Sequence, residues 1–173
     1  MATIIKDKKL AADPWLRLDA GADGAHLRPF PAIPAQGDVI VPLAVWQAER
    51  EALLARIGGR IGIQVNGHEE PSSFADDLEH FGVVAVYFKS FGDGRGFSLG
   101  RLLRERYGYK GELRAVGEVA RDHLYYMEQC GFDAFLLREG EDPVEALRGF
   151  EDFSESYSAS VARPQPLFRR RNA

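Results

Sequence analysis

Short apolar runs alternate along this chain with segments whose apolar residues recur at helical spacing. The apolar runs are Val39–Leu43, Ile61–Val65, Val83–Phe88, Leu113–Val116 and Phe132–Leu137. Each is followed by a helical pattern, so the chain consists of consecutive strand–helix units. Such units connect neighbouring strands by right-handed crossovers. The sequence therefore predicts an α/β domain with a mainly parallel sheet, either open or curled into part of a barrel.

Glycine and proline mark the limits of the predicted elements. Helical patterns are expected over 46–57, 74–81, 99–107, 119–130 and 144–150. A glycine follows each of the first four, as is typical of helix C-termini. Asp142 and Pro143 precede the last, which predicts a side-chain cap followed by a first-turn proline. Pro42 cannot donate to a sheet ladder, so it belongs at the end of its strand or on an edge.

The chain has 173 residues, of which 45% are hydrophobic, enough for one ordinary core and short for two. Residues 39–153 form the predicted α/β domain. Prolines interrupt residues 1–38, which predicts an irregular N-terminal arm or a small hairpin. Residues 154–173 form a polar tail with four arginines among its last eleven residues, and we expect this tail to be flexible.

Charge and cysteine content exclude several classes of protein. A formal net charge of −4 gives no overall basic footprint, which argues against a dedicated nucleic-acid binder. The single cysteine, Cys130, cannot form an internal disulfide or a Cys-x-x-Cys redox pair. No apolar run reaches the length of a membrane span or of a signal-peptide core. We therefore expect a cytoplasmic protein that binds neither nucleic acid nor membrane.

The segment 91–101 joins an apolar run to a helical pattern, and its sequence is FGDGRGFSLGR. Glycines there let backbone N–H groups approach a ligand, Ser98 is suited to cap the helix, and Arg95 adds positive charge. This combination is typical of an anion site. The predicted ligand-binding residues are Lys89, Asp93, Gly94, Arg95, Gly96, Ser98 and Arg101. The competing interpretation is that the glycines only form the turn.

Parallel sheets bind ligands beyond the carboxyl ends of their strands, and four loops of the predicted sheet lie at that edge. Asp93 and Glu118 follow two of these strands and are the candidate catalytic carboxylates for proton transfer. Each also has a structural interpretation. Asp93 is equally suited to brace its loop by accepting backbone N–H groups or by pairing with Arg95. Glu118 is equally suited to interact with the positive end of a helix.

Familiar cofactor signatures are absent from the sequence. The glycines of segment 91–101 do not reproduce GxGxxG, and no GxxxxGK[ST] phosphate loop occurs. A dinucleotide or nucleoside triphosphate is therefore not supported. His26, His68, His80 and His123 lack metal-ligand spacing, so no metal site is expected. Cys130 lies at a predicted helix C-terminus, where the dipole disfavours a thiolate, so we interpret it as a buried structural thiol.

Three motifs in order along the chain resemble an uncharacterised bacterial family whose domain has no known function. They are Phe91-x-Asp93-Gly94-Arg95-x-x-Ser98-x-x-Arg101-x-Leu103-Arg104, then Gly111-Glu112-Leu113-Arg114-Ala115, then Met127-x-x-Cys130-Gly131-Phe132-Asp133, and the similarity spans about Val39 to Leu137. Members of that family are often labelled as oxidoreductases and are encoded beside assimilatory sulfite reductase. This chain departs from the family pattern at Glu118, where Asp is common, and at His123, where Gln is common.

The resemblance implies an accessory role in sulfur assimilation, with sulfite reductase or a related protein as the partner. The chain would bind that partner or an anionic ligand through segment 91–101. The alternative is a redox enzyme that uses a flavin or acts on a small sulfur oxyanion. Flavin mononucleotide is the one cofactor that this alternative admits, because its phosphate site requires no single motif.

Overall fold

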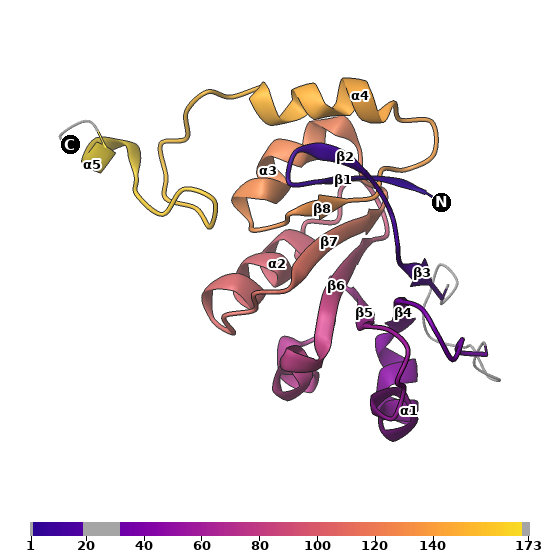
Figure 1. The fold of residues 1–173 in the computed structure, drawn as a ribbon. Helices are drawn as coiled ribbons and strands as arrows, with labels where there is room; N and C mark the ends of the chain where they lie inside the picture. The colour runs from indigo at the N-terminus through magenta and orange to yellow at the C-terminus, as the bar shows by residue number, and fades with distance from the viewer. Residues whose placement is uncertain (1, 19–31, 171–173) are drawn as a thin grey trace.

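One curved sheet organises the residues that the computed structural model describes, 2–18 and 32–170 (Figure 1). Its strands are β1 (Thr3–Lys6), β2 (Lys9–Ala12), β3 (Leu16–Arg17), β4 (Val39–Pro42), β5 (Ile61–Asn66), β6 (Phe81–Phe88), β7 (Glu112–Gly117) and β8 (Ala134–Phe135). Their order across the sheet is β2-β1-β8-β7-β6-β5-β4-β3. Strands β3 to β8 pair in parallel, and β1 pairs antiparallel with β2 and β8. The predicted mainly parallel sheet is confirmed, and of its two predicted shapes it adopts the part-barrel.

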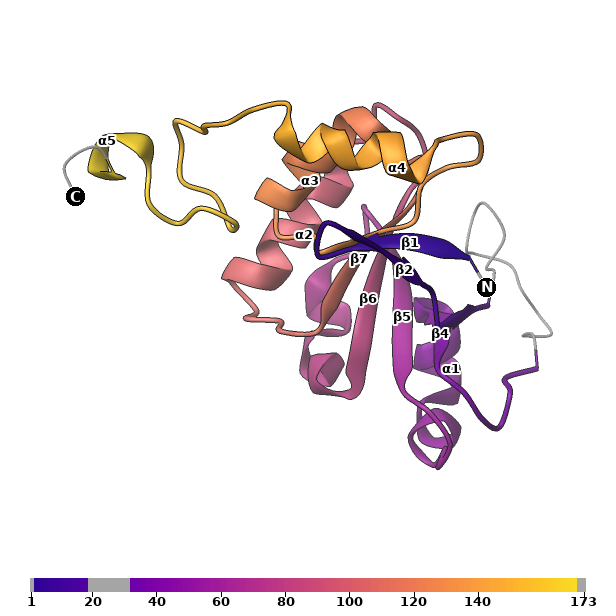
Figure 2. The ribbon, with the colours of Figure 1, turned by 45° about the horizontal axis from the view of Figure 1, so that its top comes forward.

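Helices connect the strands and cover one face of the sheet (Figure 2). They are α1 (Leu43–Leu54), η1 (Pro71–Ser73), η2 (Ala75–His80), α2 (Arg95–Glu105), η3 (Arg121–His123), α3 (Leu124–Gln129), α4 (Pro143–Ala146), η4 (Leu147–Glu151) and α5 (Leu167–Arg170), where η denotes a 3-10 helix. Leu103 of α2 and Met127 of α3 share the main core with sheet residues such as Val86. Ile40 and Val116 belong to a second, smaller cluster that contains Trp15. Apolar residues thus occur at successive strand positions because both faces of the sheet are buried.

The predicted helices differ in type or in limits from those observed. Helix α1 begins at Leu43 rather than at Trp46, and the last predicted helix becomes 3-10 from Leu147. The segment 74–81 is 3-10 rather than α-helical, and Gly82, the expected stop, lies inside β6. Helix α2 begins at Arg95, before the first residue of the predicted range. The helix expected from Val119 begins later, because the amide of Val119 bends back to donate to the carbonyl of Gly117 at 2.8 Å. The cap at Asp142 is confirmed, since its side chain accepts from the amide of Val144.

The N-terminal residues extend the sheet rather than forming only an irregular arm. Of the two predicted forms, the small hairpin is observed: β1 and β2 pair through a turn at Asp7 and Lys8. Both turn residues have positive φ, 49° and 59°, as tight two-residue hairpin turns require. Pro42 is the last residue of β4, one of the two positions that its missing N–H allows. The expectations for His26 and for the prolines between 29 and 31 fall outside the described residues.

A buried ion-pair network fastens the hairpin to β7. Arg114 is 1% exposed, and its Nε donates to an oxygen of Glu112 at 2.7 Å. Its Nη1 donates to Asp13, just beyond β2, at 2.8 Å. Glu112 also accepts from Lys6 of β1 at 2.7 Å. Charged groups that are this deeply buried are stable only when they are paired, so the network fixes how the N-terminus joins the parallel strands.

Candidate functional site

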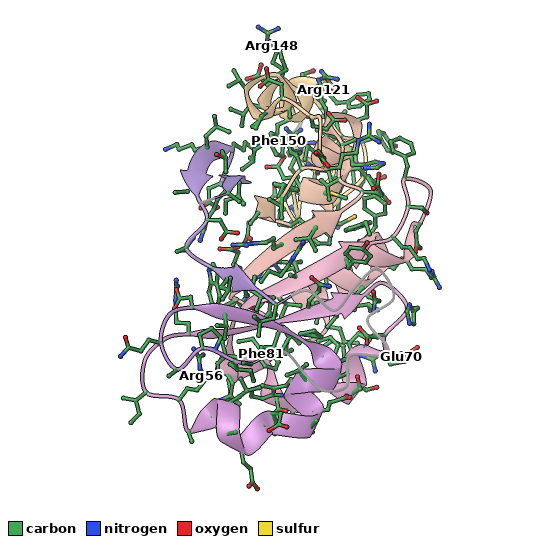
Figure 3. All side chains as sticks on the ribbon, turned by 90° about the vertical axis from the view of Figure 1, so that its right-hand side faces the viewer. Arg56, Glu70, Phe81, Arg121, Arg148 and Phe150 are labelled. Carbon is green, nitrogen blue, oxygen red and sulfur yellow. The ribbon has the colours of Figure 1, made fainter. Side chains whose placement is uncertain are left out.

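Loops that follow the parallel strands lie together at the carboxyl edge of the sheet. They are 66–70 after β5, 89–94 after β6, 118–120 after β7 and 136–141 after β8. The amide of Glu118 donates to the carbonyl of Phe88 at 2.9 Å. The amide of Arg138 donates to the carbonyl of Val119, also at 2.9 Å. In Figure 3 the strands point toward the side on which Glu70 is labelled, which is this edge. The four loops predicted to form the site are therefore neighbours.

The glycines of segment 91–101 have two different roles. Gly94 precedes α2 with φ −78° and ψ −8°, and β-carbons at Gly92 or Gly94 would meet no atom within 4 Å. A β-carbon on Gly96 would lie 2.6 Å from the ring of Phe88. The backbone of Gly96 also approaches β5, since a β-carbon on Gly67 would lie 2.7 Å from its nitrogen. Gly96 is therefore required for packing, whereas Gly92 and Gly94 are surface turn residues in ordinary conformations.

Alanine substitutions at Gly94 and Gly96 are expected to have different effects on the free energy of unfolding. Gly96→Ala should lower the free energy of unfolding by roughly 1–2 kcal/mol, because overpacking against Phe88 exceeds the gain in helix propensity. Gly94→Ala should change it by less than about 0.5 kcal/mol, because the position is open and unstrained. Urea unfolding of both variants tests the difference. Equal effects of the two substitutions would contradict it.

Asp93 and Arg95 bind each other at the start of α2. The Arg95 side chain donates from Nε to Oδ1 at 2.9 Å and from Nη2 to Oδ2 at 2.8 Å, and its amide also donates to Oδ1 at 3.2 Å. These hydrogen bonds hold the pKa of Asp93 at about 2, well below its ordinary value. The expected cap by Ser98 is wrong: Ser98 is exposed within α2, and the residue before the helix is Gly94. The carboxylate of Asp93 stands at the helix N-terminus instead.

Because Arg95 lowers the pKa of Asp93, replacing Arg95 should raise that pKa. The carboxyl of Asp93 should titrate with a pKa of about 2 in the native chain and should return toward 3.8 in Arg95→Gln. Because the folded-state pKa lies below the ordinary value, the pair stabilises the fold above that value, and this contribution disappears as the pH falls through about 2. Carboxyl-carbon NMR titration measures both values. The same pKa in both proteins would show that Arg95 is not the cause.

Two of the predicted cations of the site, Arg95 and Arg101, bind carboxylates of their own chain. Lys89 is exposed directly after β6, and Arg95 is held by Asp93. Arg101 lies in the second turn of α2, where its Nε donates to Glu105 at 3.0 Å. A phosphate, whether free or part of flavin mononucleotide, would therefore meet the Asp93 carboxylate at the helix N-terminus. This arrangement disfavours a small anion there.

Glu118, the second candidate catalytic carboxylate, lies in the loop after β7 with a side chain that is 48% exposed. One of its oxygens is 3.8 Å from Nη1 of Arg138, which also binds Glu141 at 2.8 Å. Asp93 and Glu118 thus each have an arginine neighbour at the same edge of the sheet. Since the low pKa of Asp93 keeps it ionised at neutral pH, it is poorly suited to donate a proton.

Glu69 is a third carboxyl group at this edge that the sequence analysis did not single out. It follows β5 closely, and its carboxylate accepts from the amide of Asn66. Burial raises the pKa of Glu69, which is the direction that a general acid requires. Its hydrogen bond within its own loop gives it a structural role. Its position just after a buried strand was the sequence signal for it.

Four ring side chains form a surface group in and beside segment 91–101, here called the glycine segment. This group is named the aromatic patch: Phe91, Phe97, His123 and Tyr126. Ring centroids lie 4.2 Å apart for Phe91 and His123, 6.1 Å for Phe97 and His123, and 5.1 Å for Phe97 and Tyr126. Phe91 is 56% exposed and Tyr126 58% exposed. Burial lowers the pKa of His123, which favours the neutral form of its ring. Sequence patterns missed this patch because its members come from the loop after β6, α2, η3 and α3.

Other reactive side chains are dispersed or buried. Among the described residues, no three His, Cys, Asp or Glu side chains are grouped so that they would hold a metal ion. Cys130 is 5% exposed, and burial raises the pKa of its thiol. This agrees with its interpretation as a structural residue. Over 2–18 and 32–170, no helix combines the length and apolar character that crossing a membrane requires.

Comparison with known proteins finds one family. The profile of a bacterial protein of unknown function, DUF934, matches residues 62–168. That range begins in β5, contains the glycine segment and the aromatic patch, and ends in α5. A search of curated proteins finds no match.

Proposed function

The protein belongs to the bacterial DUF934 family, and we propose that it is a cytoplasmic accessory protein of assimilatory sulfite reduction. It docks onto sulfite reductase through the glycine segment and the aromatic patch. The sulfur-assimilation setting rests on the family resemblance carried by segment 91–101 and the two motifs that follow it. The mode of action rests on the exposed surface of this chain.

The observation that carries the docking proposal is the position of Phe91. Its ring is 56% exposed and lies 4.2 Å from the ring of His123, on a loop whose backbone is fixed by β6 and α2. A large ring that is held in place while exposed loses little side-chain entropy when a partner covers it. Aromatic residues are enriched among those that dominate binding energy at protein interfaces. Tyr126, 58% exposed and 5.1 Å from Phe97, extends the same surface.

Electrostatics favour a protein partner over a small anion at this edge. Arg95 is held by Asp93 in a two-point contact of 2.8 and 2.9 Å. A free sulfite, sulfate or phosphate would have to displace that carboxylate. A protein surface covers the patch without disturbing the pair. The partner is therefore the reductase itself rather than its substrate.

Removing the ring of Phe91 tests the proposal. With the sulfite reductase of the same organism, Phe91→Ala should raise the dissociation constant by about tenfold or more, as expected for a central aromatic contact. Ile57→Ala is the matched control, because Ile57 is fully exposed on the loop after α1 and lies outside the patch. It should change the constant by less than about twofold. Titration calorimetry with the native chain and both variants measures this.

Two results would contradict the proposal. One is a native chain that does not bind the reductase, and the other is equal weakening by Phe91→Ala and Ile57→Ala. A purified protein with flavin absorbance, or one whose melting temperature rises with flavin mononucleotide, would instead support the redox enzyme. Thermal stabilisation by sulfite, sulfate or phosphate that Arg95→Ala abolishes would support a small-anion site. Reductase binding, flavin binding and anion binding would thus each support a different function for the carboxyl edge of the sheet.

A further inference from the structure

The end of the chain divides into two blocks of opposite charge. Residues 139–155 contain seven carboxylates and one arginine, Arg148. Residues 156–173 contain four arginines and no carboxylate. The net charge of the first block, −6, exceeds in magnitude the −4 of the whole chain. An acidic block therefore lies directly before a basic one.

Glu145 of α4 and Glu151 of η4 are exposed carboxylates of the acidic block. Arg148 and Arg121 are labelled at this end of the molecule in Figure 3, and they pair with Glu145 and Asp152 at 3.1 and 2.6 Å. Within the described residues, Glu151 forms no ion pair. Val144, 61% exposed, and Phe153, 61% exposed, add apolar area to the surface. The block is therefore an acidic surface with exposed apolar side chains.

Residues 156–170 of the basic block form an arm that hydrogen bonds connect to the domain and to itself. Its tip is held on the domain by the hydroxyl of Ser160, 2.6 Å from Oε1 of Gln129, and by the amide of Val161, which donates to the Gln129 carbonyl at 3.1 Å. The arm is closed at its base, where the amide of Leu167 donates to the carbonyl of Tyr157 at 3.1 Å. These bonds join the arm to α3 and connect its two ends.

The outer end of the arm lies away from its own domain. Figures 1 and 2 both show α5 extended beyond the helices, at a distance from α4. Phe168 is 55% exposed and Tyr157 73% exposed, and the guanidinium of Arg169 lies over the Phe168 ring at 6.0 Å. Arg169 forms no ion pair with any described residue. The end of the arm thus presents an exposed ring and an exposed cation.

We propose that the arm of one copy docks onto the acidic block of a second copy, giving a two-fold dimer with exchanged arms. Each chain carries both halves of the contact, so a two-fold axis satisfies both at once and closes the assembly. The charges are complementary, +4 on the basic block against −6 on the acidic one, and +2 against −5 when Glu155, Arg163 and Arg170, which pair within one chain, are set aside. Phe168 finds apolar area at Val144 and Phe153. Among the described residues, the arm pairs with the acidic block of its own chain at Glu155, which binds Arg170 at 2.8 Å and Arg163 at 3.9 Å, so the second copy supplies the contacts of Phe168 and Arg169.

Sedimentation velocity of the full chain tests the proposal. The native protein should be dimeric at about 50 mM salt and should dissociate more readily at about 500 mM, because screening weakens exposed charge pairs. Arg169→Glu should raise the dimer dissociation constant by about tenfold or more, and so should Glu145→Gln combined with Glu151→Gln. Lys9→Glu, the same charge reversal on the exposed edge strand β2, is the control and should have little effect.

A native chain that is monomeric at both salt concentrations would overturn the exchange of arms. So would a dimer that only one of the two kinds of variant weakens, because both sides of the contact are required. Circular dichroism of each variant shows that the fold is retained. The test needs no reductase, and Phe91 lies outside both blocks, so its failure is distinguishable from failure of the proposed function.

Discussion

Arg114→Ala is expected to lower the free energy of unfolding by about 3–5 kcal/mol, the largest effect of any substitution considered. Arg114 is 1% exposed and holds Asp13 and Glu112, whose side chains are 8% and 7% exposed. Without the guanidinium, Glu112 keeps Lys6, but Asp13 loses its ionic partner while it stays buried. An uncompensated buried carboxylate is the reason for the large effect. Urea unfolding followed by circular dichroism measures it.

Arg148→Ala is the matched control for Arg114→Ala. Arg148 also pairs with a carboxylate, Glu145, at 3.1 Å, but its side chain is 72% exposed. Its removal should change the free energy of unfolding by less than about 0.5 kcal/mol. The triple variant with Arg114→Met, Asp13→Asn and Glu112→Gln should recover part of the lost stability, because no unpaired buried charge remains. Equal effects at Arg114 and Arg148 would contradict this account of the network.

Gly117→Ala is expected to cost about 3 kcal/mol, the second-largest effect, from two sources. Gly117 ends β7 with φ +93°, a conformation that disfavours a side chain. A β-carbon there would also stand 2.4 Å from the carbonyl oxygen of Phe88. That carbonyl accepts from the amide of Glu118 at 2.9 Å, so it cannot withdraw without loss of the contact that joins two loops of the site.

Gly140→Ala separates the two sources of that cost. Gly140 has nearly the same conformation, φ +90°, but a β-carbon there would meet nothing within 4 Å. Its substitution should cost about 1 kcal/mol, the conformational part alone. The difference between the two variants, about 2 kcal/mol, measures the clash with Phe88. Unfolding curves that place both variants at the same stability would show that the clash is relieved without cost.

Strands β4 to β8 were predictable because burial on both faces of the sheet makes most of their residues apolar, whereas β1 to β3 lie in the segment for which we expected an arm or a small hairpin. Val83 to Phe88 is apolar at each position, since its alternate residues belong to the two clusters on opposite faces of the sheet. The glycines at 108 and 131 were equally informative, because both adopt positive φ at helix ends, +65° and +98°. These features depend on a few consecutive residues, so one sequence is enough to identify them.

Features that depend on distant residues were not predictable. The burial of Arg114 requires Asp13, which is 101 positions away, and no local pattern connects the two. The cap expected from Ser98 was wrong because α2 begins at Arg95, three residues before Ser98. The carboxylate of Asp93 accepts from the amide of Arg95 at that start. We expected the cap at Ser98, and for Asp93 a role in bracing its loop or pairing with Arg95. Only the turn before the helix decides between them.

The position of the candidate site in the fold was predictable, but the side chains that form its surface were not. Topology placed the loops after the parallel strands at one edge, and the structure brings them together there. The contact between Phe91 and His123, 4.2 Å between rings, joins residues from separate strand–helix units. Sequence spacing carries no information about such a contact. The aromatic patch therefore emerged only from the fold.

Hydrogen exchange of the protein with and without sulfite reductase tests the central claim most directly. If the reductase covers the aromatic patch, backbone amides of segments 91–101 and 121–129 should exchange more slowly in the complex, whereas those of α1 should be unchanged. Protection confined to α1 or to the edge strands, or no protection of any segment in the presence of the reductase, would contradict docking at this edge of the sheet.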